Sequence, residues 1–188
     1  MALEKVLSQL EKNKPVEKKE STLKKNSDFL DADCLEALQF RINEEEKSSR
    51  IYENMSLWFD NQGFAGAAQQ WKQDSLDELV HAGWAKEYLL NLGIQPELRE
   101  IPKQPTSFKS FMDIVEQTYA HEILVTEQCK DLASCAMKCG DHMLYQLALK
   151  YLTEQQEELG KTQNLIDKLK AFGTDPVALR LFDNELKG

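Results

Sequence analysis

The sequence has little glycine, little proline and no long apolar run, and each shortage narrows the choice of fold. Its 188 residues include 8 Gly and 5 Pro, too few for a turn-rich β architecture, which favours an all-α protein. No segment approaches the roughly 18 consecutive apolar residues that span a bilayer. The first residues, MALEKVLSQLEKNK, lack the apolar core of a secretory signal. We therefore expect an all-α chain with no membrane partner.

Cysteine is also scarce, and acidic residues outnumber basic ones. The 4 cysteines are Cys34, Cys129, Cys135 and Cys139. They show neither C-x-x-C spacing nor the density of a secreted disulfide scaffold, so we expect reduced, buried thiols and a cytoplasmic location. The net charge of −9 argues against a nucleic-acid groove and is compatible with the handling of cations.

The length suits one well-filled domain, which we place at residues 31–188. Residues 1–30 begin with a lysine-rich stretch and are predicted to form a charged, flexible tail. Leu3, Val6 and Leu7 would share one face of a short helix, so a docking helix in this tail remains an alternative.

Helical patterns and stop signals predict four long helices and a short fifth one. Gly93 provides a C-cap, the link that follows it contains three prolines, and Asp175-Pro176 is typical of a helix start. The predicted helices cover about residues 31–61, 65–92, 107–139, 141–172 and 175–185.

The lengths of the connections predict the topology. The first and third links are short and join antiparallel neighbours. The link between the second and third helices has about 14 residues, which at up to about 3.3 Å each reach roughly 45 Å, the length of a long helix. We therefore predict a four-helix bundle in which this long crossover makes the second and third helices parallel.

Each long helix carries ionisable residues in the apolar seam that faces the bundle centre. On the first hairpin, Glu45 and His81 are equally far along the chain from the turn glycine, Gly63. On the second hairpin, Glu122 and Glu158 are equally far from their own turn glycine, by the same number of residues. These side chains are therefore expected at one depth, near the middle of the bundle.

Clustered carboxylates in a core are costly unless a cation neutralises them, so this layer predicts a metal site. Glu78-x-x-His81 puts a carboxylate and an imidazole on one helical face, and such oxygen and nitrogen donors suit iron better than a thiophilic metal. Five ligands shared by two irons leave positions for water and dioxygen. The alternative is a metal-free helical scaffold or interaction protein with paired core charges.

Four stretches resemble the non-haem bacterial ferritins, and the resemblance runs from about Leu35 to Leu186. They are NEEEKSSRIYENMSLW, FAGAAQQWKQDSLDELVH, TYAHE and YLTEQQEE. The resemblance implies that Glu45 and His81 hold a first iron and that Glu78 bridges to a second. Glu122 and Glu158 would complete the shell of that second iron.

The resemblance also implies residues around the iron pair. Gln155 would lie beside the second iron, and Tyr52 would supply an electron or a hydrogen bond. Asp77, Glu154 and Glu157 match a third iron position, where Asp77 replaces the more usual Glu.

For the whole protein, the resemblance implies a ferroxidase that uses O2 or H2O2 and stores ferric mineral in a shell of 24 identical subunits. Position 79 is Leu rather than a methionine able to bind haem, so no haem is expected. A diiron protein of smaller assembly is the nearest alternative.

Overall fold

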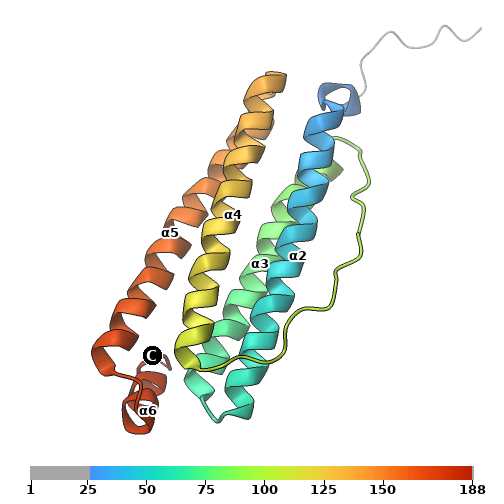
Figure 1. Cartoon of the computed structure of the whole chain (residues 1–188). Coiled ribbons are helices and arrows are strands. Elements are labelled where there is room, and N and C mark those ends of the chain that lie inside the picture. Colours follow the sequence, from blue (N-terminus) through green and yellow to red (C-terminus); the bar gives the residue numbers. More distant parts are fainter. Residues whose placement is uncertain (1–25, 188) are drawn as a thin grey trace, which may run out of the picture.

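The structure is a computed structural model that describes residues 26–187, and it is an antiparallel helical bundle with a long crossover (Figure 1). The elements are η2 (Asn26–Phe29), α2 (Ala32–Asn61), α3 (Ala65–Asn91), α4 (Phe111–Cys139), α5 (His142–Phe172) and α6 (Pro176–Glu185). These helices confirm the predicted all-α fold. Most of the predicted tail lies outside the described residues.

The start of α4 differs from the predicted start near residue 107. Ser110 has an extended backbone, and its hydroxyl accepts a hydrogen bond of 3.1 Å from the backbone N–H of Asp113. This N-cap satisfies an amide that has no partner within the helix, so the helix begins at Phe111. The same kind of cap begins α5, where Asp141 accepts from the N–H of Leu144 at 2.9 Å.

Two antiparallel hairpins make up the bundle. α2 packs most extensively on α3, and α4 packs most extensively on α5. The crossover, residues 92–110, runs along the outside of α2 from one end of the bundle to the other (Figure 1). Arg99 in the crossover makes two hydrogen bonds of 2.7 Å with the carboxylate of Glu36 on α2. At the other end, Asn54 on α2 donates to the carbonyl oxygen of Pro105. The predicted parallel arrangement of α3 and α4 is confirmed.

The core divides into two apolar clusters with a polar layer between them. One cluster lies near the start of α2 and the other near its end, and both receive side chains from all four long helices. The segments of the helices between the two clusters are residues 45–49, 74–81, 118–122 and 155–162. The acidic residues predicted at one depth all lie in this layer.

The short helix α6 is docked against the start of α3. The backbone N–H of Ala67 donates to the carboxylate of Asp183 at 2.9 Å, and Phe182 is fully buried. A Cβ at Gly66 would lie 1.9 Å from the carbonyl oxygen of Asp183, so only glycine allows this close approach. Within residues 26–187, no helix combines the length and the apolar character needed to cross a membrane.

Candidate metal centre

Three predicted ligands meet in the polar layer on the α2–α3 hairpin. Glu45 comes from α2, and Glu78 and His81 come from successive turns of α3. One ligand atom from each lies within 4.8 Å of the others, and the three side chains are 1%, 3% and 6% exposed. Nδ1 of His81 lies 3.3 Å from Oε2 of Glu78. The i, i+3 spacing on α3 therefore produces the shared face that the sequence predicts.

The α4–α5 hairpin supplies the other half of the layer. Glu122 is buried on α4, and Gln155 is buried on α5. The hydroxyl of Thr126 donates to the amide oxygen of Gln155 at 3.0 Å and fixes that side chain. Glu158 is partly buried and, in the described part of the chain, is not among the three ligands within 4.8 Å of one another, yet its charge helps to raise the pKa of Glu122. The predicted residues thus converge from all four helices.

Two buried oxygen atoms of this layer lack a partner. Oε2 of Glu45 and Oε2 of Glu122 are shielded from solvent and have no hydrogen bond within the described part of the chain. Buried polar atoms are nearly always satisfied, because leaving one unpaired costs about 1–3 kcal/mol. The donor set is mostly carboxylate with one imidazole, which fits a cation of intermediate hardness such as Fe(II).

Burial sets the protonation of the acidic residues. It raises the pKa of Glu78 from 4.5 to about 8, with a further rise from the charge of Glu122. Burial also raises the pKa of Glu122 to about 7, against the lowering effect of its hydrogen bond from Tyr52. The pKa of Glu45 is raised well above 4.5 for the same reason. Without a bound cation, the layer therefore retains protons that a metal would displace.

Two basic side chains that were not predicted also reach the layer. Nε of Arg41 lies 2.8 Å from Oε1 of Glu45, and both side chains are 1% exposed. Lys161 lies 2.6 Å from Asp74 and 3.2 Å from Glu158. They occupy the positions four before Glu45 and three after Glu158, and this helical spacing is the signal that could have revealed them.

Aromatic hydroxyls hold two of the predicted ligands. Tyr52, which is buried on α2, donates to Oε1 of Glu122 across the bundle. Tyr151 on α5 donates to the backbone carbonyl oxygen of His81 at 2.6 Å. The first contact brings Tyr52 against a predicted ligand, while its place beside an iron pair stays a prediction. The second contact fixes the turn of α3 that carries the imidazole.

The three residues predicted for a third iron are less closely gathered. Oε1 of Glu154 lies 3.6 Å from Nε2 of His81, so this acid borders the metal layer. Asp77 accepts a hydrogen bond from Gln73 at 2.9 Å, and Glu157 is exposed. In residues 26–187, these three acids are not among the groups whose ligand atoms lie within 4.8 Å of one another. The third position stays a prediction.

Comparison with known proteins identifies the family. The model of the ferritin-like domain family matches residues 35–172, which is most of the chain and includes every residue described above for the candidate metal centre. The chain belongs to the ferritin family. The non-haem ferritin of Escherichia coli O6:H1 is 30% identical over 158 residues, which cover 84% of this chain and 96% of that protein. The corresponding protein of Campylobacter jejuni is 28% identical over 159 residues, covering 85% of this ferritin and 95% of its own length.

Solved structures agree with this assignment. An open pore ferritin from the archaeon Archaeoglobus fulgidus superposes with a TM-score of 0.81 at 29% identity, covering 84% of this chain and 98% of that chain. The likeness therefore extends to almost the whole length of the archaeal ferritin. It includes the four-helix bundle that brings the carboxylates and the histidine together.

Proposed function

We propose that this ferritin binds Fe(II) in its polar layer, oxidises it with O2 or H2O2 and stores the product as ferric mineral. The observation that carries the proposal is the buried group of Glu45, Glu78 and His81, faced by Glu122 from the opposite hairpin. The unpaired oxygens of Glu45 and Glu122 give this layer two oxygen atoms that are free to coordinate a cation. A bound cation would stabilise both of these buried oxygen atoms, because a buried charge is costly unless it is paired.

The proposed roles of the ligands follow their positions. Glu45 and His81 would hold the first iron, and Glu78, whose ligand atom lies within 4.8 Å of theirs, would bridge to the second iron. Glu122 and Glu158 hold the second iron. In this assignment Lys161, which is now 3.2 Å from Glu158, must release that carboxylate when the second iron binds.

The chemistry supplied by the pair of irons is electron transfer to an oxygen species. Two Fe(II) ions give two electrons, which with two protons convert O2 to H2O2 or convert H2O2 to two molecules of water. The buried acids that release protons on metal binding lie next to this reaction. Tyr52, which donates a hydrogen bond to Glu122, would provide an electron or a hydrogen bond, and Gln155 would lie beside the second iron.

The storage role requires an assembly with a cavity, and we propose the shell of 24 subunits in the cytoplasm. The α6 helix, with Val177 and Leu181 exposed on its outer surface, provides apolar surface for contacts between subunits. Size-exclusion chromatography with light scattering tests this part. A particle of several hundred kilodaltons is expected, and a dimer or decamer would instead assign the chain to a diiron protein of smaller assembly.

Substitution of the ligands tests the proposed ferroxidase activity. His81→Ala and Glu45→Ala should each abolish the rapid oxidation of Fe(II) in air while leaving the size of the assembly unchanged. The matched control is His142→Ala, since His142 is exposed at the start of α5, far along the bundle from the polar layer. Oxidation at the full rate in the first two variants would exclude this site, and an uncatalysed rate in the unsubstituted protein would exclude the activity.

A further inference from the structure

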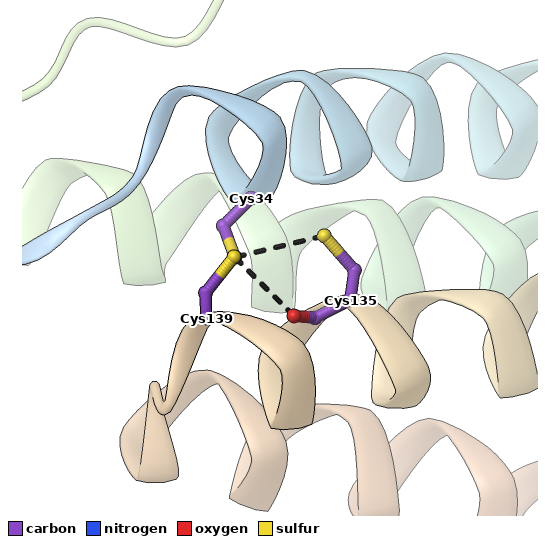
Figure 2. Close-up of side chains that lie close together, drawn as sticks. All are labelled: Cys34, Cys135 and Cys139. Atoms are coloured by element: carbon purple, nitrogen blue, oxygen red, sulfur yellow. Dashed lines mark hydrogen bonds between the residues drawn. The ribbon is translucent and has the colours of Figure 1, made fainter.

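Three cysteines gather at the end of the bundle opposite α6. Cys34 lies in the first turn of α2, and Cys135 and Cys139 lie on the last turns of α4. Figure 2 shows the three side chains pointing toward one another from these two helices. Their sulfur atoms all lie within 4.8 Å of one another, and those of Cys34 and Cys135 are 3.6 Å apart.

This cysteine cluster is separate from the polar layer of the bundle. Cys34 precedes Glu45 on α2 by 11 residues, which corresponds to about 16 Å along a helix at about 1.5 Å per residue. One of the two apolar core clusters, including Leu38 and Ile42, fills the space between them. A metal ion bound by the three cysteines would therefore be coordinated by different side chains from those proposed to bind iron.

The sulfur atoms have the spacing of ligands around one metal ion. A metal–sulfur bond of about 2.3 Å with tetrahedral angles places two sulfurs about 3.8 Å apart. Cys135 and Cys139 are one helical turn apart, so a single face of α4 presents two ligands to the third on α2. We propose that Cys34, Cys135 and Cys139 bind one soft metal ion, Cu(I) or Zn(II), through three thiolates. Thiolates select these ions over the harder Fe(II).

The surroundings of the cluster suit such an ion. A surface pocket of about 270 Å³ reaches Cys139, and another of about 300 Å³ reaches Cys135, so an ion can approach from outside. Asp31, the N-cap of α2, lines the first pocket and offers a carboxylate as a further ligand.

Metal binding explains the cluster better than a redox-sensing thiol does. Reactive cysteines are exposed and have a lowered pKa, because the thiolate is the attacking form. Cys34 is fully buried, so its sulfur is closed to an oxidant in the solvent. A disulfide would also use only two of the three sulfurs. A single cation with three thiolate ligands uses all three.

The test is the retention of Cu(I) by the full-length, iron-free assembly. The protein is loaded anaerobically in the presence of a reductant, challenged with a chromogenic Cu(I) chelator, desalted and analysed for copper. We expect one copper per subunit in the unsubstituted protein. Cys139→Ser should lower the affinity by at least tenfold, and the double variant Cys135→Ser/Cys139→Ser should retain no copper. X-ray absorption should show sulfur neighbours around the copper.

Cys129→Ser provides the matched control, because Cys129 is a buried cysteine on α4 that lies outside the cluster. It should retain one copper per subunit. Equal retention by the double variant, or copper surrounded by oxygen and nitrogen, would overturn the proposal.

A second experiment measures the retention of Zn(II) by the His81→Ala variant, in which a competing zinc ligand of the polar layer is absent. Retention that the cysteine substitutions abolish supports Zn(II) as the ion, and the relative affinities decide between the two metals. If the chelators remove both ions from the unsubstituted protein, the cluster is not a metal site. Oxidation of Fe(II) by Cys135→Ser/Cys139→Ser should be unchanged, so failure of this proposal leaves the ferroxidase proposal intact.

Discussion

The phenol of Tyr52 on α2 donates a hydrogen bond to Oε1 of Glu122 on α4, while Oε2 of the same carboxylate has no partner within residues 26–187. The contact crosses between the two hairpins in the middle of the bundle. It leaves one carboxylate oxygen of Glu122 available to a cation in the polar layer. Tyr52 therefore orients a proposed iron ligand and is separated from the proposed second iron only by the side chain of Glu122.

Tyr52→Phe tests this relationship. We expect the same number of Fe(II) ions bound per subunit and a several-fold slower oxidation, because the ligand loses its orienting hydrogen bond and the site loses a phenol. Anaerobic titration measures binding, and stopped-flow absorbance measures the rate. Tyr119→Phe, on the partly buried Tyr119 of α4, is the control and should oxidise iron normally. An unchanged rate in Tyr52→Phe would mean that the phenol has no part in the reaction.

Lys161→Met tests whether this lysine competes with the second iron. Asp74 is 8% exposed and would lose its ion pair of 2.6 Å with Lys161, which is itself 33% exposed. The metal-free protein should therefore lose about 1–3 kcal/mol of unfolding free energy, less than for a fully buried pair. Glu158 is freed at the same time, and the second metal position should bind more tightly. Urea unfolding and Fe(II) titration provide the two measurements. Weaker binding in the variant would contradict the competition.

The control for this substitution is Lys168→Met. Lys168 lies on the same helix and pairs with Glu185 at 2.8 Å, but both side chains are exposed by more than 40%. Exposed ion pairs contribute about 0–1 kcal/mol, so its removal should change little.

The metal-free protein should become less stable as the pH rises. Glu78 has an ordinary pKa of 4.5 when unfolded and about 8 in the fold, so the folded state holds the extra proton between these values. The unfolding free energy therefore falls across this interval, by a few kcal/mol at about 1.4 kcal/mol per pH unit. Below 4.5 and above 8 this residue adds no further change.

Denaturant unfolding of the iron-free protein at several pH values measures this slope. Glu78→Gln keeps the shape of the side chain but cannot lose a proton, so its stability should depend less on pH. A saturating divalent cation should remove much of the dependence in the unsubstituted protein, because the cation compensates the ionised carboxylates. A slope of the opposite sign would contradict the assignment of protons to this layer.

Asp77→Ala tests the predicted third iron position. If Asp77 contributes to it with Glu154 and Glu157, its loss should change the number of Fe(II) ions oxidised per O2 consumed and slow the turnover of iron. Oxygen-electrode measurements during iron addition give both values. Asp167→Ala is a close control, since Asp167 accepts from Gln163 at 3.0 Å as Asp77 accepts from Gln73 at 2.9 Å. If Asp77→Ala and Asp167→Ala both oxidise the same number of Fe(II) ions per O2 as the unsubstituted protein, Asp77 does not contribute to a third iron position.

The sequence was sufficient to predict the fold and the common depth of the acidic residues in the bundle. Both depend on local signals: the glycine turns fix where each hairpin reverses, and the helical rise then determines the level of each side chain. Gly63 and Gly140 have positive φ values of 75° and 70°, which confirms them as the reversal points. This is why Glu45 and Glu122 could be placed in one layer without coordinates.

The remaining features depend on which helix faces lie next to each other. No role was predicted for Arg41 from the sequence, and its pairing with Glu45 on the same helix is a local contact. The packing of α2 on α4 buries this pair and lets Arg41 donate to Gln128 at 2.8 Å. The cysteine cluster was missed in the same way: the expectation of buried thiols is confirmed for Cys34 and Cys129, but Cys135 and Cys139 are only partly buried. Their convergence required the pairing of the start of α2 with the end of α4.

The division of the bundle into two hairpins has a consequence for how the protein resists unfolding. The α2–α3 hairpin provides Glu45, Glu78 and His81, and the α4–α5 hairpin provides Glu122 and Glu158. An iron pair bound between them would act as a removable cross-link, in addition to the side-chain packing and the polar contacts, such as the hydrogen bond from Tyr52 to Glu122, that already join the two hairpins. Iron loading would then lengthen the lifetime of the native state, and amide protons at the interface between the hairpins would exchange more slowly. The cell's iron supply would then affect the kinetic stability of the protein as well as the amount of iron that it binds.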